Sequence, residues 1–336
     1  MQIADDEYQK EVRLDILKDC FRRALRLTNE ENDNSSLAQI VFGAQVISGE
    51  NWGYRNRFQF HSGGLKRRAQ ESIVALDDCP VAVPEIRNLL KNKMLPEKYG
   101  RLHVFNGNVS QEDGLEASIP NRFDKAGRTS PNNEDIQEVS VDICSKKIFF
   151  DIRGFFQSNI GTFEKAVESI RPYIEKHAYA PSNGQAQTEL LDMYSGVGTF
   201  SALFGDLFTK TTLVEHNKKA LRLADKNLVG IQHDVFAMSG EKWVRTPAAR
   251  KKYGAVIIDP PRSGIEKPVM SWLCGMPHGN KPDVIFSVSC DPVTHARDAA
   301  SLTAAGYEMT TLMMLDFYPQ TSHIESFAVF VNKRGE

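Results

Sequence analysis

Several features that would define a special class of protein are absent from this chain. Its five cysteines are scattered and form no Cys-x-x-Cys pair, so no disulfide framework is indicated and a reduced, cytoplasmic setting is expected. No uninterrupted apolar run approaches the roughly 20 residues of a membrane-spanning helix, and the acidic first residues lack the apolar segment of a signal peptide. The sequence therefore predicts neither export nor insertion into a membrane.

Charge of one sign is not in large excess either. The formal net charge is −2, which by itself gives no sign of a nucleic-acid partner. Between residues 55 and 128, thirteen Lys and Arg stand against nine Asp and Glu, and an excess of this size is typical of a solvated surface. With 336 residues, of which 41% are hydrophobic, the chain is long enough for two folded domains.

The chain does contain a change of pattern along its length. Apolar residues recur every three or four positions between residues 8 and 27, which predicts an amphipathic helix that packs against a domain. After a polar break, short strand-like pieces such as Ile40–Phe42 and Phe58–Phe60 predict a mostly β domain that reaches about residue 150. Within it, residues 107–137 are rich in Asn, Ser, Gly and acidic residues, which predicts a mobile loop.

The second half of the chain alternates short apolar runs with helical patterns, such as a helix over 218–227. Four of the runs are predicted strands: Leu190–Tyr194, Thr211–Glu215, Ala255–Asp259 and Val284–Val288. Such runs are typical of buried parallel strands, and ligands bind beyond the carboxyl ends of these strands. We expect an α/β protein in three parts: an N-terminal helix (1–36), a smaller, mostly β central domain (37–150) and a Rossmann-like domain (151–336).

A glycine-containing turn, Ser195-Gly-Val-Gly198, follows the first of these strands. Gly196 and Gly198 let the backbone approach a ligand closely, because glycine has no side chain in the way. Glu215, at the end of the next strand, is suited to both hydroxyls of a ribose. The full Gly-x-Gly-x-x-Gly fingerprint is missing, which favours S-adenosylmethionine over a dinucleotide, since a methyl donor has no pyrophosphate to hold. The alternative is a tight turn without a ligand.

Two further acidic residues are candidates near such a ligand. Asp234 either closes the adenine side or is a helix cap or a solvated charge. Asp259 begins the turn Asp259-Pro-Pro-Arg262, whose prolines hold it at the crevice. In enzymes that methylate amino groups an aromatic residue typically follows such prolines, whereas here the residue is Arg262, which can bind phosphate or carboxylate. This difference disfavours methylation of an amine.

Cys290 and Glu325 supply the two groups needed to methylate C5 of a pyrimidine. Uracil C5 is a weak nucleophile, but a thiolate that adds to C6 makes C5 enolate-like, and a base must then remove the C5 proton. Cys290 would need a setting that lowers its pKa, or loss of its proton as the base docks. Glu325 heads an apolar strand, where burial would raise its pKa. Each residue also has a structural interpretation. Cys290 could be a buried cysteine that only packs, and Glu325 could be a charge at the edge of the sheet. For His323 the structural interpretation is an imidazole whose hydrogen bonds are satisfied within the protein.

At these residues the chain resembles the RNA uracil-5-methyltransferase family, which methylates C5 of uridine in transfer or ribosomal RNA. The matching segments, in the family's order, are Phe155–Asn159, Leu191–Phe200, Val214–Glu215, Asp259–Arg262, Ser289–Pro292 and Phe317–Glu325. The resemblance implies a Rossmann-like methyltransferase domain that uses S-adenosylmethionine, with Cys290 as nucleophile and Glu325 as proton acceptor. The cofactor-site residues that it implies are Gln157, Tyr194, Thr199, Glu215, Asp234 and Asp259.

The resemblance extends to the central domain, through Tyr54–Arg57 and Cys79–Pro80, and to the N-terminal helix. The chain departs from larger members because no cysteine cluster and no room for a small RNA-binding barrel precede that helix. We therefore expect no iron–sulfur cluster and no metal site, and RNA binding by the central domain. Its candidate phosphate contacts, each also interpretable as an ordinary surface charge, are Arg55, Arg57, Lys66, Arg67 and Arg68. The target uridine is expected in a loop and flipped out of the stack.

The sequence thus predicts a cytoplasmic methyltransferase that modifies uridine C5 in tRNA or rRNA. Two alternatives stay open: methylation of another RNA base or an amine, and a catalytically silent RNA-binding protein that keeps the fold. Cys290 and Glu325 disfavour the silent protein, because it has no chemical need for the pair. Nothing in the sequence indicates which RNA, which uridine or which oligomeric state.

Overall fold

The computed structural model describes residues 4–28, 35–67, 70, 72–95, 101–111, 136–178, 188–276 and 279–333. The chain forms two compact units. The first comprises Met1–Gly49, Val141–Phe149 and Gly161–Glu336, and the second comprises Glu50–Ser140 and Phe150–Ile160. Arg68 and most of the loop predicted over 107–137 lie outside the described residues.

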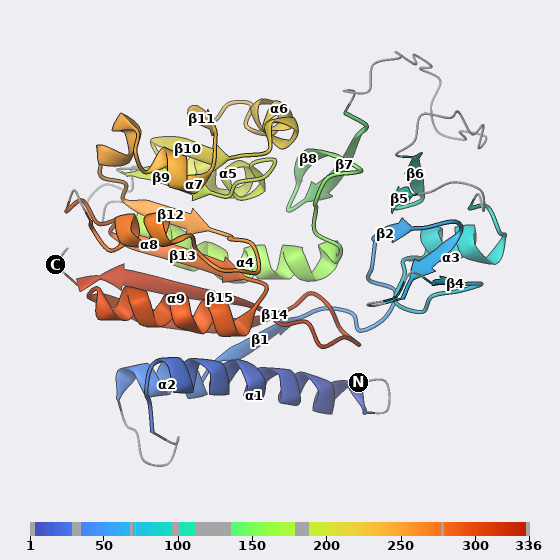
Figure 1. Ribbon diagram of the computed structural model, residues 1–336, viewed down its shortest axis with the longest axis horizontal. Helices are drawn as coiled ribbons and strands as arrows, with labels where there is room; N and C mark the ends of the chain where they lie inside the picture. Colours follow the sequence, from blue (N-terminus) through green and yellow to red (C-terminus); the bar gives the residue numbers. More distant parts are fainter. Residues whose placement is uncertain are drawn as a thin grey trace. The chain divides into compact units, whose positions relative to one another are not determined.

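A sheet of eight strands, counted in the described part of the chain, is the centre of the first unit (Figure 1). In spatial order the strands are β1 (Gln45–Ser48), β14 (Tyr307–Asp316), β15 (Glu325–Asn332), β13 (Val284–Ser289), β12 (Ala255–Ile258), β9 (Glu189–Met193), β10 (Lys210–Glu215) and β11 (His233–Ala237). All neighbouring pairs are parallel except the two that β15 makes with β13 and β14. The predicted α/β class and the four predicted parallel strands are confirmed.

Helices cover both faces of this sheet (Figure 1). The helices of the first unit are α1 (Asp6–Ala24), α2 (Ser36–Phe42), α4 (Ile160–Ala178), α5 (Thr199–Phe204), α6 (Lys218–Asn227), α7 (Gly240–Trp243), α8 (Lys267–Leu273) and α9 (Pro292–Ala304). Short 3-10 turns occupy Gly205–Leu207 and Pro247–Arg250. α6 has the bounds predicted from the sequence. Of the helices within the described ranges, none is long and apolar enough to cross a membrane.

The strands carry apolar side chains to both helical layers. Met193 of β9 lies in one core together with Leu17 of α1 and Trp272 of α8. On the other face, Phe163 of α4 contacts Phe317 edge-on, with ring centroids 6.0 Å apart. Burial on both faces explains why these strands read as nearly continuous apolar runs in the sequence.

The N-terminal helix buries a different stripe from the one that its apolar residues suggest. Asp5 caps α1 by accepting a hydrogen bond from the backbone N–H of Tyr8 (2.8 Å). The buried residues of α1 recur every four positions: Gln9, Arg13, Leu17 and Phe21. Ile16, which belongs to the predicted apolar stripe, is 46% exposed. A glutamine and an arginine therefore occupy the buried row, and both have partners in the first unit.

The strand predicted at Ile40–Phe42 is wrong, because these residues end α2. Ser35 caps this helix by accepting a hydrogen bond from the backbone N–H of Ala38 (3.2 Å). A short apolar run cannot by itself distinguish a strand from a buried helix, and the capping serine is the deciding signal here. α2 and β1 both belong to the first unit, so the predicted boundaries at residues 36 and 150 differ from the bounds of the two units.

The second unit has a small core of its own. Its strands and helix are β2 (Arg57–Phe60), β3 (Gly64–Lys66), β4 (Ile73–Ala75), α3 (Pro84–Lys91), β5 (Leu102–Phe105) and β6 (Asn108–Gln111). β7 (Glu138–Ile143) and β8 (Lys146–Asp151) form a two-stranded sheet with residues in both units. β2, β5 and β6 form an antiparallel sheet, on which Ile86 of α3 packs against Phe60 and Val104.

Candidate active site

The carboxyl ends of the parallel strands form one edge of the sheet in the first unit. The strand order reverses at β9, because β10 and β11 continue on one side of it and β12 and β13 on the other. In open α/β sheets, ligands bind at such a reversal, beyond the carboxyl ends of the strands. The predicted site residues that lie at or directly after these ends are Tyr194, Glu215, Asp259 and Cys290. The structure therefore brings them to one edge.

The turn after β9 has the backbone conformation that its glycines allow. Tyr194, Gly196 and Gly198 have φ angles of 62°, 56° and 75°, in the left-handed region that favours glycine. A Cβ atom on Gly198 would lie 2.9 Å from the side chains of Leu213 and Leu228, whereas one on Gly196 would meet nothing within 4 Å. Gly198 is thus required for packing, and Gly196 leaves an open face of backbone.

Glu215 is held at the end of β10 by this turn. Its side chain is buried; Oε2 accepts a hydrogen bond from the N–H of Gly196 (3.1 Å), and Oε1 accepts one from the N–H of Asn217 (2.7 Å). Oε1 also lies 2.9 Å from Nδ1 of His216, so Oε2 keeps a second acceptor position. The hydroxyl of Ser195 in the same turn is buried without a hydrogen-bond partner in this structure. A bound polar ligand would satisfy both groups.

Asp192, near the end of β9, stabilises the turn through hydrogen bonds to α5. Its Oδ2 accepts hydrogen bonds from the N–H (3.1 Å) and the hydroxyl (2.5 Å) of Ser201. Burial raises the pKa of Asp192 to about 7, although these hydrogen bonds act in the opposite direction. The contact ties the end of β9 to α5, and Thr199 is the first residue of that helix. The predicted cofactor turn is therefore anchored at both ends.

Tyr194 has a partner that the sequence does not reveal. Its hydroxyl lies 3.4 Å from Oε2 of Glu266, which is the N-cap residue of α8. The same oxygen accepts a hydrogen bond from the N–H of Glu241 (2.9 Å). Burial raises the pKa of the Tyr194 phenol above its usual value, so the phenol stays neutral. Glu266 thereby joins the turn after β9 to the starts of α7 and α8, and no local motif marks this residue.

Cys290 directly follows β13, and Glu325 is the first residue of the neighbouring antiparallel strand β15. β13 and β15 pair Ser289 with Ser326, so the next position outward sets Cys290 opposite Glu325. Residues directly opposite each other in such a pair have Cβ atoms roughly 4.5–5.5 Å apart. Glu325 is 8% exposed and Cys290 is half-buried. The structure therefore brings the predicted nucleophile and the predicted base together.

Burial keeps both groups protonated at neutral pH. It raises the pKa of Cys290 to about 11; the carboxylates of Glu325 and Asp259 add to this rise, and Arg262 opposes it. Burial likewise raises the pKa of Glu325 to about 8, with Asp259 adding and Arg262 opposing, and it raises the pKa of Asp259 to about 6. The rise predicted for Glu325 is confirmed. The pKa of Cys290 is not lowered, so the thiol has to lose its proton in the course of any nucleophilic reaction.

Arg262 places a positive charge beside the thiol. The Arg262 side chain is exposed, within hydrogen-bonding reach of Cys290, and its Nη2 lies 3.4 Å from Nδ1 of His323. His323 is exposed as well and meets the ring of Tyr318 edge-on at 5.7 Å. The carbonyl of Arg262 accepts a hydrogen bond from the hydroxyl of Thr294 (3.1 Å), which fixes the turn to α9. A cation in this place suits a phosphate group or a developing negative charge.

The structure does not place Asp234 with these residues. Asp234 is the second residue of β11 and pairs in register with Thr212. At about 3.3 Å per residue, it lies roughly 10 Å before Ala237 at the carboxyl end of the strand. Its side chain is 43% exposed and forms an ion pair with Lys210 (2.7 Å). The geometry thus fits a solvated, paired charge and not the adenine contact.

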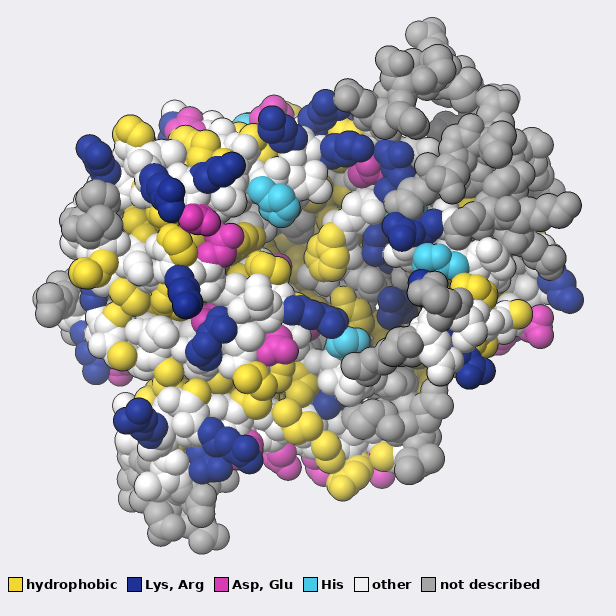
Figure 2. Space-filling view, viewed as in Figure 1, with side chains coloured by type: hydrophobic (Ala, Val, Ile, Leu, Met, Phe, Trp, Pro, Cys, Tyr) yellow, Lys and Arg dark blue, Asp and Glu magenta, His cyan; other side chains and the backbone are white. Residues whose placement is uncertain are grey.

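Gln157 and the basic candidates belong to the second unit. Arg55 donates a hydrogen bond to the backbone carbonyl of Arg57 (3.1 Å), and Arg57 donates one to a backbone carbonyl of the same unit (2.5 Å). Lys66 and Arg67 are exposed. Figure 2 shows Lys and Arg side chains dispersed among apolar and acidic ones on the face in view. Lys66 and Arg67 are thus more exposed than Arg55 and Arg57, which are half-buried.

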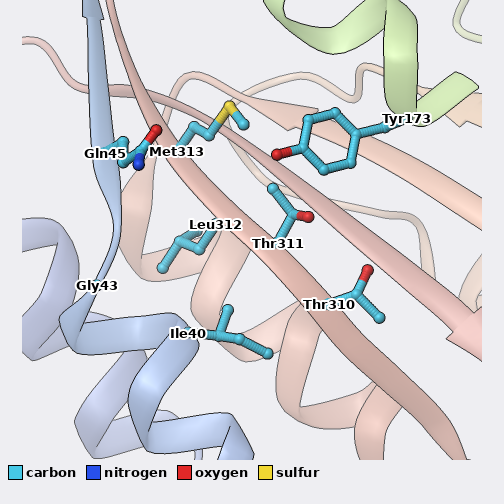
Figure 3. Close-up of a pocket in the computed structure, with 8 residues that line it drawn as sticks. All are labelled: Ile40, Gly43, Gln45, Tyr173, Thr310, Thr311, Leu312 and Met313. Carbon is cyan, nitrogen blue, oxygen red and sulfur yellow. The ribbon is translucent and has the colours of Figure 1, made fainter.

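A pocket of about 160 Å³ in the first unit is lined by none of the predicted site residues (Figure 3). Its lining comes from Ile40, Gly43, Gln45, Tyr173 and the β14 segment Thr310–Met313. Tyr173 extends from α4 toward β14, where the hydroxyl groups of the two threonines lie (Figure 3). The pocket therefore has no part in the chemistry considered for the sheet edge.

The cysteines of the described chain all have free thiols. Over the same described ranges, no three His, Cys, Asp or Glu side chains are close enough together to hold a metal ion.

The fold and the site together define a Rossmann-like methyltransferase. The sheet reverses its order beside a glycine turn with an acidic strand end, and a thiol lies opposite a carboxylate at the same edge. Residues 155–334 match the model of the tRNA (Uracil-5-)-methyltransferase family. The chain is also 36% identical to a Treponema denticola protein described as an uncharacterized RNA methyltransferase, over 98% of this chain and 80% of that one. The chain belongs to the tRNA (uracil-5-)-methyltransferase family, as its motifs predict.

More distant relatives agree with this placement. The 23S rRNA (uracil(1939)-C(5))-methyltransferase RlmD of Salmonella typhi is 25% identical, over 85% of this chain and 72% of its own length. Among solved structures, the Pyrococcus abyssi tRNA (uracil-54, C5)-methyltransferase in complex with S-adenosyl-L-homocysteine matches with a TM-score of 0.69. That match covers 98% of this chain and 84% of the other at 21% identity, and it shows that the fold is shared.

Proposed function

We propose that this chain methylates C5 of a uridine in RNA, with S-adenosylmethionine as the methyl donor, Cys290 as the nucleophile and Glu325 as the base. The observation that carries the proposal is that Cys290 and Glu325 both adjoin the last residue pair of β13 and β15, at the sheet edge that also holds the glycine turn, and that the charge of Glu325 acts on the thiol. C5 methylation needs one covalent step and one proton removal, and a thiol beside a carboxylate of raised pKa matches that pair of steps.

The edge beside β9 fits S-adenosylmethionine. The open face of Gly196, the unpartnered hydroxyl of Ser195 and the carboxylate of Glu215 are suited to a ribose and its neighbouring groups. The cofactor residues that we propose are Tyr194, Gly196, Gly198, Thr199, Glu215 and Asp259, whereas Gln157, which belongs to the second unit, stays a prediction from the sequence. S-adenosyl-L-homocysteine, the demethylated form of this donor, is present in the Pyrococcus abyssi structure, which supports the choice.

The chemistry of this chain's own residues has three steps. The Cys290 thiolate forms a bond to C6 of the uracil, and the electron pair of the C5=C6 bond moves onto C5 and O4 as an enolate. Bound S-adenosylmethionine supplies the methyl group that C5 then accepts. Glu325 takes the C5 proton, the electron pair re-forms the C5=C6 bond, and the thiolate of Cys290 leaves. Arg262 stabilises the negative charge during the first and last steps because it lies beside the sulfur.

We propose tRNA or rRNA as the substrate class. One relative is named for 23S rRNA and one for tRNA, and the family model is a tRNA model. The candidate phosphate contacts are the basic residues of the second unit, of which Lys66 and Arg67 are exposed. The uridine has to leave the base stack, since a stacked base hides C6 from the thiol of Cys290.

The test is methyl transfer from labelled S-adenosylmethionine to total RNA that lacks 5-methyluridine, followed by mass analysis of the nucleosides. Formation of 5-methyluridine is expected. A different methylated nucleoside, or methyl groups on an amine, would support the alternative enzyme. RNA binding without any transfer would support the silent binding protein.

Turnover is expected to rise with pH between about 6 and 9. Glu325 acts as a base only when ionised, and with a pKa of about 8 its carboxylate fraction falls about tenfold for each pH unit below that value. The thiolate fraction of Cys290, whose pKa is about 11, rises through the same interval. Single-turnover rates at constant ionic strength should therefore be at least about tenfold higher at pH 8 than at pH 6. A flat profile would contradict the assignment of the base.

A further inference from the structure

The loop that leads into Glu325 is fastened to the N-terminal helix. This loop, residues 317–324, connects β14 to β15. Gln320 lies in the loop: its Oε1 accepts a hydrogen bond from Nε2 of Gln9 (3.0 Å), and its Nε2 donates one to Oδ1 of Asp6 (2.5 Å). One loop side chain is thus bound by two residues in the first turn of α1.

A buried ion pair fixes the start of the same loop. Nη1 and Nη2 of Arg13 donate to Oδ1 (2.5 Å) and Oδ2 (3.1 Å) of Asp316, the last residue of β14, and both side chains are at most 3% exposed. Nη1 also lies 3.5 Å from the carbonyl oxygen of Tyr318. Leu315, next to Asp316, pairs with Glu325 in the register of β14 and β15. Arg13 therefore fixes Asp316, which is next to Leu315, the residue that pairs with Glu325.

Helix α1 is also linked to Ser326, the residue after Glu325, through His295. Phe21 of α1 meets the ring of His295 edge-on, with centroids 5.3 Å apart. Nδ1 of His295 and Oγ of Ser326 share a hydrogen bond of 2.7 Å, and both residues are buried. Contacts that begin at α1 thus flank Glu325 on both sides along the chain.

The loop needs such support because its backbone is strained. Gln320 has a φ of 64°, a conformation that costs free energy in a residue other than glycine. Within the loop, the hydroxyl of Thr321 donates to the carbonyl of Tyr318 (2.7 Å), and the N–H of His323 donates to Oγ1 of Thr321 (3.2 Å). The two hydrogen bonds from Gln320 to α1 offset the strain and select one position for the loop.

We infer that α1 is a positioning element for Glu325, with Arg13 and Gln320 as positioning residues; this inference rests on the proposed function. A base has to lie within hydrogen-bonding reach of the proton it removes, and a displacement of about 1 Å can cost about a hundredfold in rate. Loosening the loop slows removal of the C5 proton but leaves the attack of Cys290 and the methyl transfer in place. The methylated covalent adduct between RNA and protein then accumulates.

The test compares turnover and denaturation-stable RNA adduct in Gln320→Glu, which puts a carboxylate where Gln320 donates to Asp6. Turnover is expected to fall about tenfold and the adduct to increase severalfold, toward the level in Glu325→Gln. Adding Asp6→Asn supplies an amide N–H at position 6 that can donate to the new carboxylate at position 320. The double variant should therefore regain most of the turnover. Glu11→Gln, at an exposed carboxylate on α1, is the matched control and should behave as wild type in both assays.

Arg13→Lys is the second variant, because lysine keeps the charge but loses the two-pronged contact with Asp316. It should also accumulate adduct, and amide hydrogen exchange of residues 316–326 should be faster in both variants. Leu221→Ala, a core change in α6, should lower the melting temperature without adduct. Reduced turnover without adduct in both Gln320→Glu and Arg13→Lys, or unchanged exchange at 316–326, would overturn the positioning role. If Glu325→Gln itself traps no adduct, the proposed base chemistry has failed, and the positioning role fails with it.

Discussion

Replacement of Cys290 by alanine is expected to reduce methyl transfer to RNA by at least about a thousandfold and to remove the covalent adduct. Without the sulfur nothing adds to C6, so C5 stays a weak nucleophile and Glu325 has no intermediate from which to take a proton. Cys290 is half-buried just beyond the last residue pair of β13 and β15, so its loss leaves the strand pairing in place. Activity should therefore disappear while the melting temperature stays nearly unchanged.

Cys274→Ala is the matched control for this variant. Cys274 is also half-buried, its sulfur lies 3.9 Å from the sulfur of Met270 and from the carbonyl of Ser301, and burial raises its pKa. It should transfer methyl groups at the wild-type rate. The measurement is labelled methyl incorporation into RNA, with the adduct followed on denaturing gels. Formation of 5-methyluridine by Cys290→Ala at a comparable rate would contradict the covalent mechanism.

The parts of the site that the sequence predicts are those that depend on local chemistry. Apolar runs buried on both faces mark the parallel strands, and three of the four predicted runs, Leu190–Tyr194, Thr211–Glu215 and Ala255–Asp259, end in a polar residue at the ligand edge. The glycines at 196 and 198 mark a turn that needs positive φ angles, and the structure has them there. Parallel strands bring their carboxyl ends to one edge, so the grouping of Glu215 and Asp259 follows from their positions at strand ends.

The parts that the sequence does not predict depend on register and on long-range partners. From the sequence, Asp234 is open to interpretation as an adenine contact, a helix cap or a solvated charge, and the structure places it as the second residue of β11, away from the carboxyl end of that strand. The pairing of Cys290 with Glu325 requires β15 to run antiparallel between β13 and β14, and no local pattern specifies that order. Arg13 gives one usable signal: it is a charged residue in the row of α1 that also holds Leu17 and Phe21.

Polar residues in that row also explain why the apolar stripe of α1 is misread from composition alone. A buried arginine is tolerated only when a carboxylate satisfies it, and Asp316 is hundreds of positions away in the sequence. The need for a partner is predictable from Arg13, but the identity of the partner is not. The contact between α1 and the end of β14 can therefore be identified only from the folded structure.

Replacement of Glu325 by glutamine is expected to have the opposite signature to the loss of Cys290. Glutamine keeps the size and strand position of the side chain but cannot take the C5 proton, so the reaction should stop after methyl transfer with Cys290 still bonded to C6. Turnover should fall by roughly a hundredfold to ten-thousandfold, and a stable adduct containing methylated uridine should accumulate to near the enzyme concentration. Mass analysis of the adduct, after digestion of both RNA and protein, identifies the methyl group and the bonded residue.

Glu308→Gln is the matched control, because Glu308 lies near the other end of β14 and pairs with Lys333 at the surface (3.8 Å). It should turn over at the wild-type rate without adduct. Rapid turnover by Glu325→Gln would mean that a different group removes the proton. Asp259 would then be the leading candidate, because its charge acts on both Cys290 and Glu325 and its pKa of about 6 leaves it ionised at neutral pH. In that case turnover above about pH 7 should follow the thiolate fraction of Cys290 alone, because Asp259 is already ionised there.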